Sequence, residues 1–214
     1  MFAYCLNNPV CLIDPLGNTP INPFIWFIKK KLEEAHDALK AIMEANFKNN
    51  SAIDNDSSTT TRNKLINDQN GLTGSSFKYG LYPASWNACE TIAVHNAKVL
   101  LGIESTLSQT MMDFQCAGAM IGDGYFGSNP FAIGGVLENS GISYTNVGVS
   151  DMTQAGTYII SVWNENPLEN GLHTIAISYD GTTYSAYNLT CYGLVEEINP
   201  ADYSFSYICG YYLR

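Results

Sequence analysis

The sequence lacks several features that mark common kinds of site. Its six cysteines form no C-x-x-C pair and have no histidine at zinc-ligand spacing, so neither a metal site nor a disulfide scaffold is expected. No stretch approaches the roughly 20 apolar residues that span a bilayer. The N-terminus also lacks the basic start and apolar run of a signal peptide. We therefore expect no metal or other cofactor, no membrane span, a cytoplasmic location when the chain is expressed alone, and any export to depend on something outside this chain.

Positive charge is scarce in the second part of the chain. Residues 1–80 carry eight basic and eight acidic side chains, whereas residues 81–214 carry two basic and twelve acidic ones. A surface this acidic repels phosphate backbones, which disfavours nucleases and DNA-binding proteins. The 214 residues are 46% hydrophobic, enough for the core of one domain with additional segments.

Composition divides the chain into four segments. Residues 1–18 carry turn-forming prolines and a glycine, and residues 49–78 are rich in Asn, Ser, Thr, Asp and Gly, which predicts a partly disordered linker. The main domain is expected at residues 79–214. Residues 19–48 have an apolar and basic start that also fits a membrane surface, but packing of this segment on protein is the preferred reading. This segment is predicted to be an amphipathic helix, because apolar residues recur at three- and four-residue steps: Leu32, Ala35, Leu39, Ile42 and Met43.

The most informative motif is an Asp-Gly pair at residues 180–181 between two alternating apolar runs, which is typical of a β-hairpin. If these two residues form the loop, Tyr179 opposes Thr182 and His173 opposes Asn188. Directly opposed residues project to the same face with Cβ atoms roughly 5 Å apart. We therefore expect the imidazole of His173 beside the carboxamide of Asn188, as two members of a Cys-His-Asn triad.

A cysteine at the start of a helix supplies the third member. Asn87 is expected to cap a helix that ends at Gly102, with Glu90 three residues after the cap. Cys89 then lies in the first turn, where the helix dipole stabilises a thiolate and the main-chain N–H can bind an oxyanion. A small buried residue at a helix start is the alternative reading of Cys89. The remaining cysteines of the domain lack this context and are expected to be core thiols: Cys116, Cys191 and Cys209.

Elimination leaves His173 as the base. His36 lies in the amphipathic segment outside the main domain, and His95 follows Cys89 by six residues on one helix, about 9 Å along its axis and out of reach. The predicted site thus has Cys89 as nucleophile, His173 as base and Asn188 as the residue that orients the ring. Asn87 is a second oxyanion donor, and Trp86 lines the substrate channel or belongs to the core.

Residues 79–214 resemble the papain-like cysteine peptidases, in which a cysteine at a helix start precedes a histidine that opens a strand and an Asn or Asp on the next strand. Residues 156–163 and 173–178 resemble the sheet of the bacteriocin-processing type, and residues 129–141, with Asn129 as cap, resemble its second helix. The resemblance implies an α+β fold with an N-terminal catalytic helix packed on an antiparallel sheet. It also implies that the substrate is a protein or peptide. Such peptidases often carry a Gln six residues before the cysteine, where this chain has Pro83, and the bacteriocin-processing group usually has Asp in place of Asn188.

The first 18 residues resemble the end of the core of Rhs/YD-repeat proteins. This resemblance implies that a variable C-terminal module follows, often a toxin with a dedicated immunity protein as its partner. Asn18 stands where the self-cleaving versions usually have an apolar residue. The matching positions are Tyr4, Asn7, Asn8, Pro9, Asp14, Pro15 and Gly17.

These patterns together predict a cysteine-dependent hydrolase of amide bonds, secreted or delivered as the effector module of a larger Rhs-type protein. Deamidation, transglutamination and other acyl transfer by the same triad remain open, because all proceed through a thioester. A peptidase that cleaves its own parent protein near residues 14–18 or within residues 49–78 also remains open. A catalytically inert papain-like binding module is the alternative that is not an enzyme.

Overall fold

A computed structural model describes residues 23–54, 61–72, 77–164, 171–190 and 193–214 of the chain. The chain divides into two compact units, Met1–Ala45 and Asn46–Arg214. The motif predicted at residues 1–18 lies outside the described residues. Helix α1 (Pro23–Asp54) confirms the predicted helical segment and extends it beyond residue 48. Among the described helices, α1 included, none combines the length and apolarity that crossing a bilayer requires.

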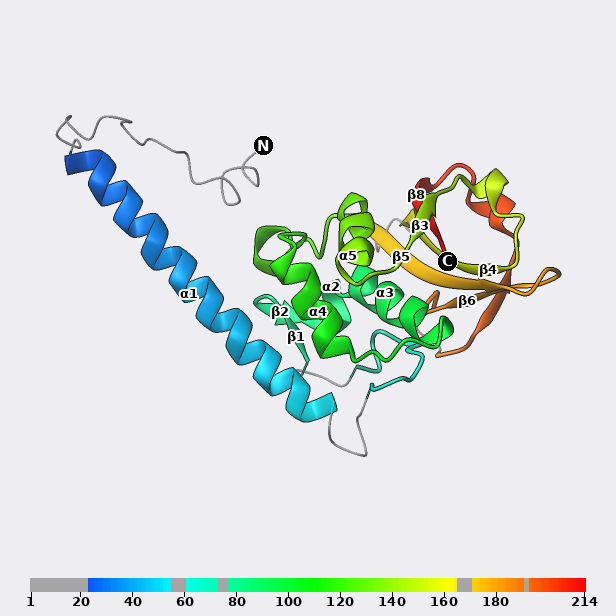
Figure 1. The fold of residues 1–214 in the computed structure, drawn as a ribbon, viewed down its shortest axis with the longest axis horizontal. Coiled ribbons are helices and arrows are strands. Elements are labelled where there is room, and N and C mark those ends of the chain that lie inside the picture. The colour runs from blue at the N-terminus through cyan, green and yellow to red at the C-terminus, as the bar shows by residue number, and fades with distance from the viewer. Residues whose placement is uncertain (1–22, 55–60, 73–76, 165–170, 191–192) are drawn as a thin grey trace. The chain divides into compact units, whose positions relative to one another are not determined.

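The second unit contains helices packed on a sheet of six antiparallel strands (Figure 1). The strands follow one another across the sheet in the order β3 (Tyr144–Asn146), β8 (Tyr207–Leu213), β4 (Gly156–Asn164), β5 (Gly171–Tyr179), β6 (Tyr184–Tyr187) and β7 (Glu196–Ile198). The helices are α2 (Ala84–Asn87), α3 (Cys89–Leu100), α4 (Leu107–Cys116) and α5 (Ile133–Asn139), and a small ribbon joins β1 (Lys78–Tyr79) to β2 (Tyr82–Pro83). The chain is therefore of mixed α and β class with an antiparallel sheet, as predicted.

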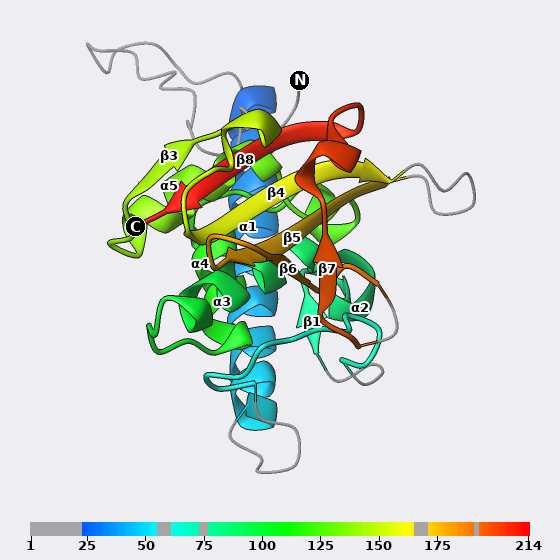
Figure 2. The same ribbon diagram turned by 90° about the vertical axis from the view of Figure 1, so that its right-hand side faces the viewer.

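Each face of the sheet has its own hydrophobic core. On one face, Ile159 of β4 packs in a cluster with Ile92 of α3, and Figure 1 shows α3, α4 and α5 together on that side. On the other face, Ile160 and Ile175 pack in a second cluster with Tyr203 of the 3₁₀ turn η5 (Pro200–Tyr203). Figure 2 shows this second side toward the viewer, with the helices behind the strands. Because strand residues alternate between faces, side chains in register with Ile159 face α3, whereas those in register with Ile160 and Ile175 face away from it.

Two of the predicted helix boundaries are confirmed. Gly102 ends α3 with a φ of 72°, and the N–H of Ile103 donates to the Lys98 carbonyl at 2.9 Å, which is the Schellman arrangement that favours glycine. The side chain of Asn129 accepts from the N–H of Phe131 and caps the 3₁₀ turn η3 (Pro130–Ala132), which leads directly into α5. Local sequence signals were therefore sufficient to place these two ends.

The predicted linker at residues 49–78 is wrong for much of its length. Residues 61–72 and Phe77 belong to the second unit, and Ile66 and Leu72 are buried in the core with α3. Asn96 of α3 binds the main chain of Ile66 on both sides, accepting from its N–H and donating to its carbonyl, each at 2.8 Å. The polar composition of residues 61–72 therefore did not indicate that a helix side chain holds the main chain of this segment in the second unit.

Candidate active site

Cys89 is the first residue of α3 and lies against strand β5. Its sulfur is 3.9 Å from the main-chain oxygen of Leu172, the residue before His173, and the N–H of Thr174, the residue after it, donates to the thiol. Strand β6 pairs with β5 only from Ala176 onward, so this part of the β5 edge is open to the sulfur. The helix start and the histidine-bearing strand are therefore brought together, as predicted.

The environment of Cys89 favours the neutral thiol. The side chain is 8% exposed, and burial, followed by the negative charge of Glu90, raises the pKa of the Cys89 thiol well above its ordinary value. The N–H of Thr174 acts in the opposite direction. The expectation that the helix start lowers this pKa is therefore wrong for the resting protein, because desolvation outweighs the helix dipole.

Glu90 is a buried carboxyl group that the sequence analysis treated only as part of a cap. It is 2% exposed, and burial raises its pKa from 4.5 to about 7. Its own N–H, the Cys89 thiol and the N–H of Ser128 donate to the carboxylate, whereas Oε2 has no hydrogen-bond partner. The single thiol proton of Cys89 thus has two acceptors, the Leu172 carbonyl and the Glu90 carboxylate, both of which stabilise the neutral thiol.

The ring of His173 is held by a main-chain group. Nε2 lies 2.6 Å from the carbonyl oxygen of Asn188. Because a carbonyl only accepts, Nε2 must carry the proton, and in the neutral ring the basic lone pair is then at Nδ1. The ring therefore has the tautomer that a general base acting through Nδ1 requires.

The predicted hairpin register is wrong by two residues. Tyr179 pairs with Tyr184 rather than Thr182, and Ile177 pairs with Ala186, so the loop spans residues 180–183. Oδ1 of Asp180 accepts from the N–H groups of Thr182 and Thr183, each at 2.8 Å, and the rings of Tyr179 and Tyr184 stack at 3.9 Å. The carboxylate-bonded turn and the tyrosine pair therefore outweigh the preference of Asp-Gly for a two-residue loop.

The predicted contact between the His173 ring and the Asn188 carboxamide is also wrong. Asn188 follows the end of β6 with a φ of 62°, and its Nδ2 donates to Oε1 of Gln69 at 3.4 Å. Nε2 of Gln69 in turn donates to the carbonyls of Ala84 and Ser85 at 3.2 and 3.1 Å. Asn188 therefore holds the ring through its main chain and connects to α2 through its side chain.

The sulfur and the imidazole approach β5 from different sides. His173 opposes Val162, a member of the second cluster, whereas Thr174 and its partner Ser161 are fully buried on the α3 side with hydroxyls 2.9 Å apart. Since a peptide oxygen lies roughly 3 Å from the next Cα, the sulfur lies at most about 7 Å from the Cα of His173. Transfer of the thiol proton to Nδ1 therefore requires the ring to change its rotamer and leave the Asn188 carbonyl.

Two further predicted roles are affected by the loop around η2 (Gly122–Gly124). Asn87 does not cap α3, because its Nδ2 donates to the carbonyls of Tyr79 and Gly124 at 2.9 and 2.5 Å. Both amide hydrogens are thus engaged, so Asn87 is not an oxyanion donor in this arrangement. Trp86 is 67% exposed and lies against Tyr82 and Tyr125 with ring centroids 6.4 Å away in each case, so it is a surface residue rather than a core residue.

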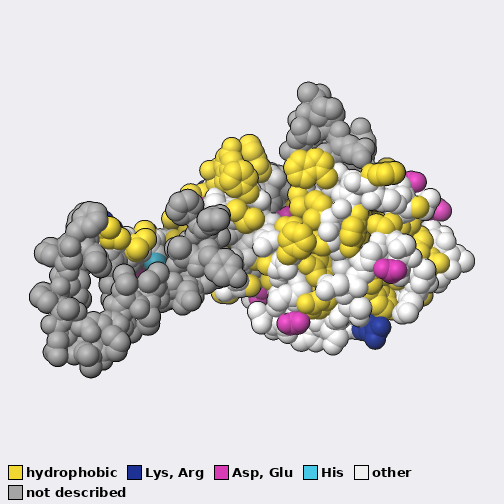
Figure 3. Space-filling view, turned by 90° about the horizontal axis from the view of Figure 1, so that it is seen from above, with side chains coloured by type: hydrophobic (Ala, Val, Ile, Leu, Met, Phe, Trp, Pro, Cys, Tyr) yellow, Lys and Arg dark blue, Asp and Glu magenta, His cyan; other side chains and the backbone are white. Residues whose placement is uncertain are grey.

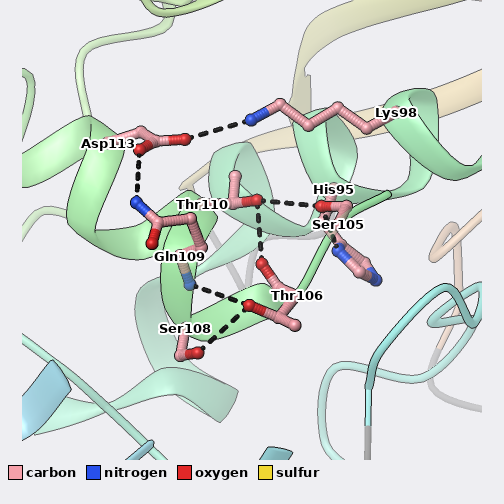
Figure 4. A network of polar contacts seen from close by, with 8 residues as sticks. All are labelled: His95, Lys98, Ser105, Thr106, Ser108, Gln109, Thr110 and Asp113. Carbon is pink, nitrogen blue, oxygen red and sulfur yellow. Dashed lines mark hydrogen bonds and ion pairs between the residues drawn. The ribbon is translucent and has the colours of Figure 1, made fainter. Parts of the chain in front are cut away.

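The other described histidine of this unit has a structural role. His95 is fully buried; Nδ1 lies 2.8 Å from the Ser105 hydroxyl, and Nε2 lies 2.8 Å from the Lys64 carbonyl. Figure 4 shows it within a network that continues through Thr110 to α4. Its distance from the predicted site agrees with its exclusion as the base.

The remaining cysteines differ in their exposure. Cys116 ends α4 and is exposed, so the expectation of a core thiol is wrong there, whereas Cys209 lies in β8 and is partly buried. Cys191 lies outside the described residues. Exposed Cys116 provides an internal reference against which the reactivity of Cys89 can be measured.

Two residues of the site were missed by sequence reasoning. Glu90 was visible as the acidic neighbour of Cys89, but its burial depends on the fold of residues 124–128 around it, and Gln69 lies in the segment taken for a linker. Within the described residues, no group of three or more His, Cys, Asp or Glu side chains is placed to hold a metal ion. A scan against protein-family models and a search of curated proteins both find no match to this chain.

Proposed function

We propose that this protein is a papain-like thiol enzyme that acts on amide bonds of a protein or peptide, with Cys89 as nucleophile and His173 as base. The observation that carries the proposal is the position of the Cys89 sulfur at the first residue of α3, 3.9 Å from the carbonyl that precedes His173. The tautomer imposed on His173 by the Asn188 carbonyl supports it, because Nδ1 is then the basic atom.

In the proposed reaction, Nδ1 of His173 takes the thiol proton of Cys89 as the sulfur attacks the amide carbonyl carbon. The main-chain N–H of Cys89 stabilises the oxyanion. The imidazolium then protonates the leaving amine as the C–N bond breaks, which leaves a thioester on Cys89. Water attacks the thioester carbon and transfers a proton to Nδ1, the C–S bond breaks to release the carboxylic acid, and the proton on Nδ1 returns to the sulfur. An amine in place of water gives transamidation by the same steps.

The raised thiol pKa makes this a general-base mechanism rather than one that begins from a preformed thiolate–imidazolium pair. The resting thiol is neutral and buried, so proton transfer and sulfur attack occur together when the imidazole adopts the rotamer that faces the sulfur. In the resting protein the Asn188 carbonyl, rather than the Asn188 carboxamide, is the group that orients the ring.

The test uses a peptide vinyl sulfone, which forms a thioether with an activated cysteine, and intact-protein and peptide mass spectrometry. We expect Cys89 to react faster than exposed Cys116 in the wild type, and this preference to be lost in His173→Gln but kept in the control His36→Gln. Labelling of Cys116 in preference to Cys89 in the wild type contradicts the proposal and favours the inert binding module.

We further propose that the module is the effector part of an Rhs-type protein, on the basis of the motif at residues 1–18. Expression of the module inside bacterial cells is expected to arrest growth, and Cys89→Ala is expected to abolish this effect. Equal growth of cells that express the wild type and Cys89→Ala contradicts the effector role but leaves the thiol chemistry to the labelling test.

A further inference from the structure

A cavity of about 260 Å³ lies on the side of β5 to which His173 projects. Its lining comes from β4, β5, the segment after β6 and the region of η5. Figure 2 shows the η5 region beside the ends of β4 and β5. Small-molecule sites usually measure roughly 300–1,000 Å³, so this cavity matches one side chain rather than a whole ligand. The lining residues are Val162, Trp163, His173, Leu189, Asp202, Tyr203 and Ser206.

The lining of this cavity is acidic and aromatic. Among the described residues that line it, Asp202 is the one carboxylate. The charges of Asp202 and Glu196 both act on the Tyr203 hydroxyl, whose pKa is raised first by burial and then by these two groups. Trp163 is 51% exposed at the cavity, which leaves part of its indole ring available to a ligand. A carboxylate beside an exposed indole is a combination that binds cations, through charge and through the face of the ring.

The two basic residues of the segment that forms the cavity are engaged with other groups. Lys98 and Arg214 are the two basic residues between positions 81 and 214; Lys98 pairs with Asp113 at 3.0 Å, and Arg214 lies over the ring of Tyr212. On the face seen in Figure 3, acidic side chains are spread over the second unit and basic ones are scarce. An acidic domain steers cationic ligands toward its surface and repels anionic ones.

We infer that the cavity receives a lysine or arginine side chain of the polypeptide substrate, with Asp202 facing its charge and Trp163 packing along it. The inference rests on the proposed function, since the cavity lies beside the proposed base His173 and its occupant belongs to the substrate of that base. The apolar part of a lysine or arginine matches Val162 and Leu189, and its charged end matches Asp202. The substrate class is therefore a polypeptide that carries a lysine or arginine.

The binding test uses the full chain with Cys89→Ala, so that no reaction occurs, and Trp26→Phe with Trp86→Phe, so that Trp163 is the single tryptophan. The ligands are acetyl-Ala-Lys-Ala-amide and the same peptide with norleucine in place of lysine. We expect saturable quenching of Trp163 by the lysine peptide, about tenfold weaker binding in Asp202→Asn, and no change in the charge-matched control Asp123→Asn.

Equal affinity for the norleucine peptide, no binding of either peptide, or equal binding by Asp202→Asn and the parent each overturn the inference. Because this readout needs no thiol, its failure is distinct from failure of the proposed function, which the vinyl sulfone labelling of Cys89 reports separately.

Discussion

The Nε2 atom of His173 lies 2.6 Å from the main-chain oxygen of Asn188, while the carboxamide of the same asparagine is bonded to Gln69. The imidazole is thus oriented by the backbone at the end of β6, and the side chain at position 188 connects that end to the segment before Cys89. This division of roles separates the structure from a Cys-His-Asn triad in which the carboxamide holds the ring.

Replacement of Asn188 tests the main-chain role. Because Asn188 has a φ of 62°, we expect Asn188→Gly to fold with near-normal stability and Asn188→Ala to lose about 1 kcal/mol more than Asn188→Gly. In both variants the rate of vinyl sulfone labelling of Cys89 stays within about threefold of wild type, because the carbonyl is retained; loss of an essential catalytic group typically costs 10²–10⁴-fold. A fall of that larger size in Asn188→Gly, with unchanged thermal unfolding, shows that the carboxamide is the catalytic partner.

Removal of the charge at Glu90 is expected to activate the thiol. The negative charge of Glu90 raises the pKa of Cys89, so Glu90→Gln lowers that pKa and increases the thiolate fraction at a given pH. The rate of iodoacetamide alkylation of Cys89 at pH 8 should rise by up to about tenfold, because the thiolate is the reactive form. The exposed residue Glu104 offers a control, Glu104→Gln, that should leave the rate unchanged. A slower reaction in Glu90→Gln contradicts this electrostatic account.

The same carboxyl group makes stability depend on pH. Burial raises the pKa of Glu90 from 4.5 to about 7, so folding favours the protonated form. Its contribution is fully present below pH 4.5 and is lost as pH rises through 7. The difference between these pKa values corresponds to about 3 kcal/mol. Urea unfolding should therefore show Glu90→Gln to be more stable than wild type at pH 8 and of similar stability at pH 4, and a constant difference at both pH values excludes this role of Glu90.

The segment at residues 61–72 is expected to contribute to the stability of the second unit. Asn96→Ala leaves the N–H and carbonyl of Ile66 without their side-chain partner in a fully buried position, which should cost about 2–4 kcal/mol. Thermal unfolding and limited proteolysis of residues 61–72 measure this, with Asn139→Ala at an exposed position as the control. Unchanged unfolding together with unchanged proteolysis in Asn96→Ala restores the original prediction of a linker.

Local signals predicted the parts of the fold that depend on local chemistry. Glycine at residue 102 and the Asn-Pro pair at residues 129–130 marked helix boundaries correctly, and alternation of apolar residues on both sides of Asp180 located β5 and β6. The strand β4 was expected only from the family resemblance of residues 156–163. The placement of Cys89 at a helix start followed from the same kind of pattern, although the cap itself is not the side chain of Asn87.

Features that depend on tertiary contacts were not predictable in this way. The register of the β5–β6 hairpin is determined by the Asp180 turn and the stacked tyrosines, and the pKa of Cys89 is determined by burial against β5 and by Glu90. Asn87 carries the residue type of a cap, but the carbonyls of Tyr79 and Gly124 compete for its side chain. A sequence pattern gives the residue types available at a site, whereas the packing decides which atoms they contact.

The most direct test of the action of His173 on Cys89 is the pH dependence of Cys89 alkylation by iodoacetamide, with and without His173→Gln. Both proteins carry Glu90→Gln so that no second group titrates in the same range, and exposed Cys116 serves as the internal reference. We expect the two profiles to differ: at a given pH, alkylation of Cys89 relative to Cys116 is faster in the protein with His173 than in His173→Gln, because the imidazole takes the thiol proton. Identical profiles for the two proteins would contradict this action of His173.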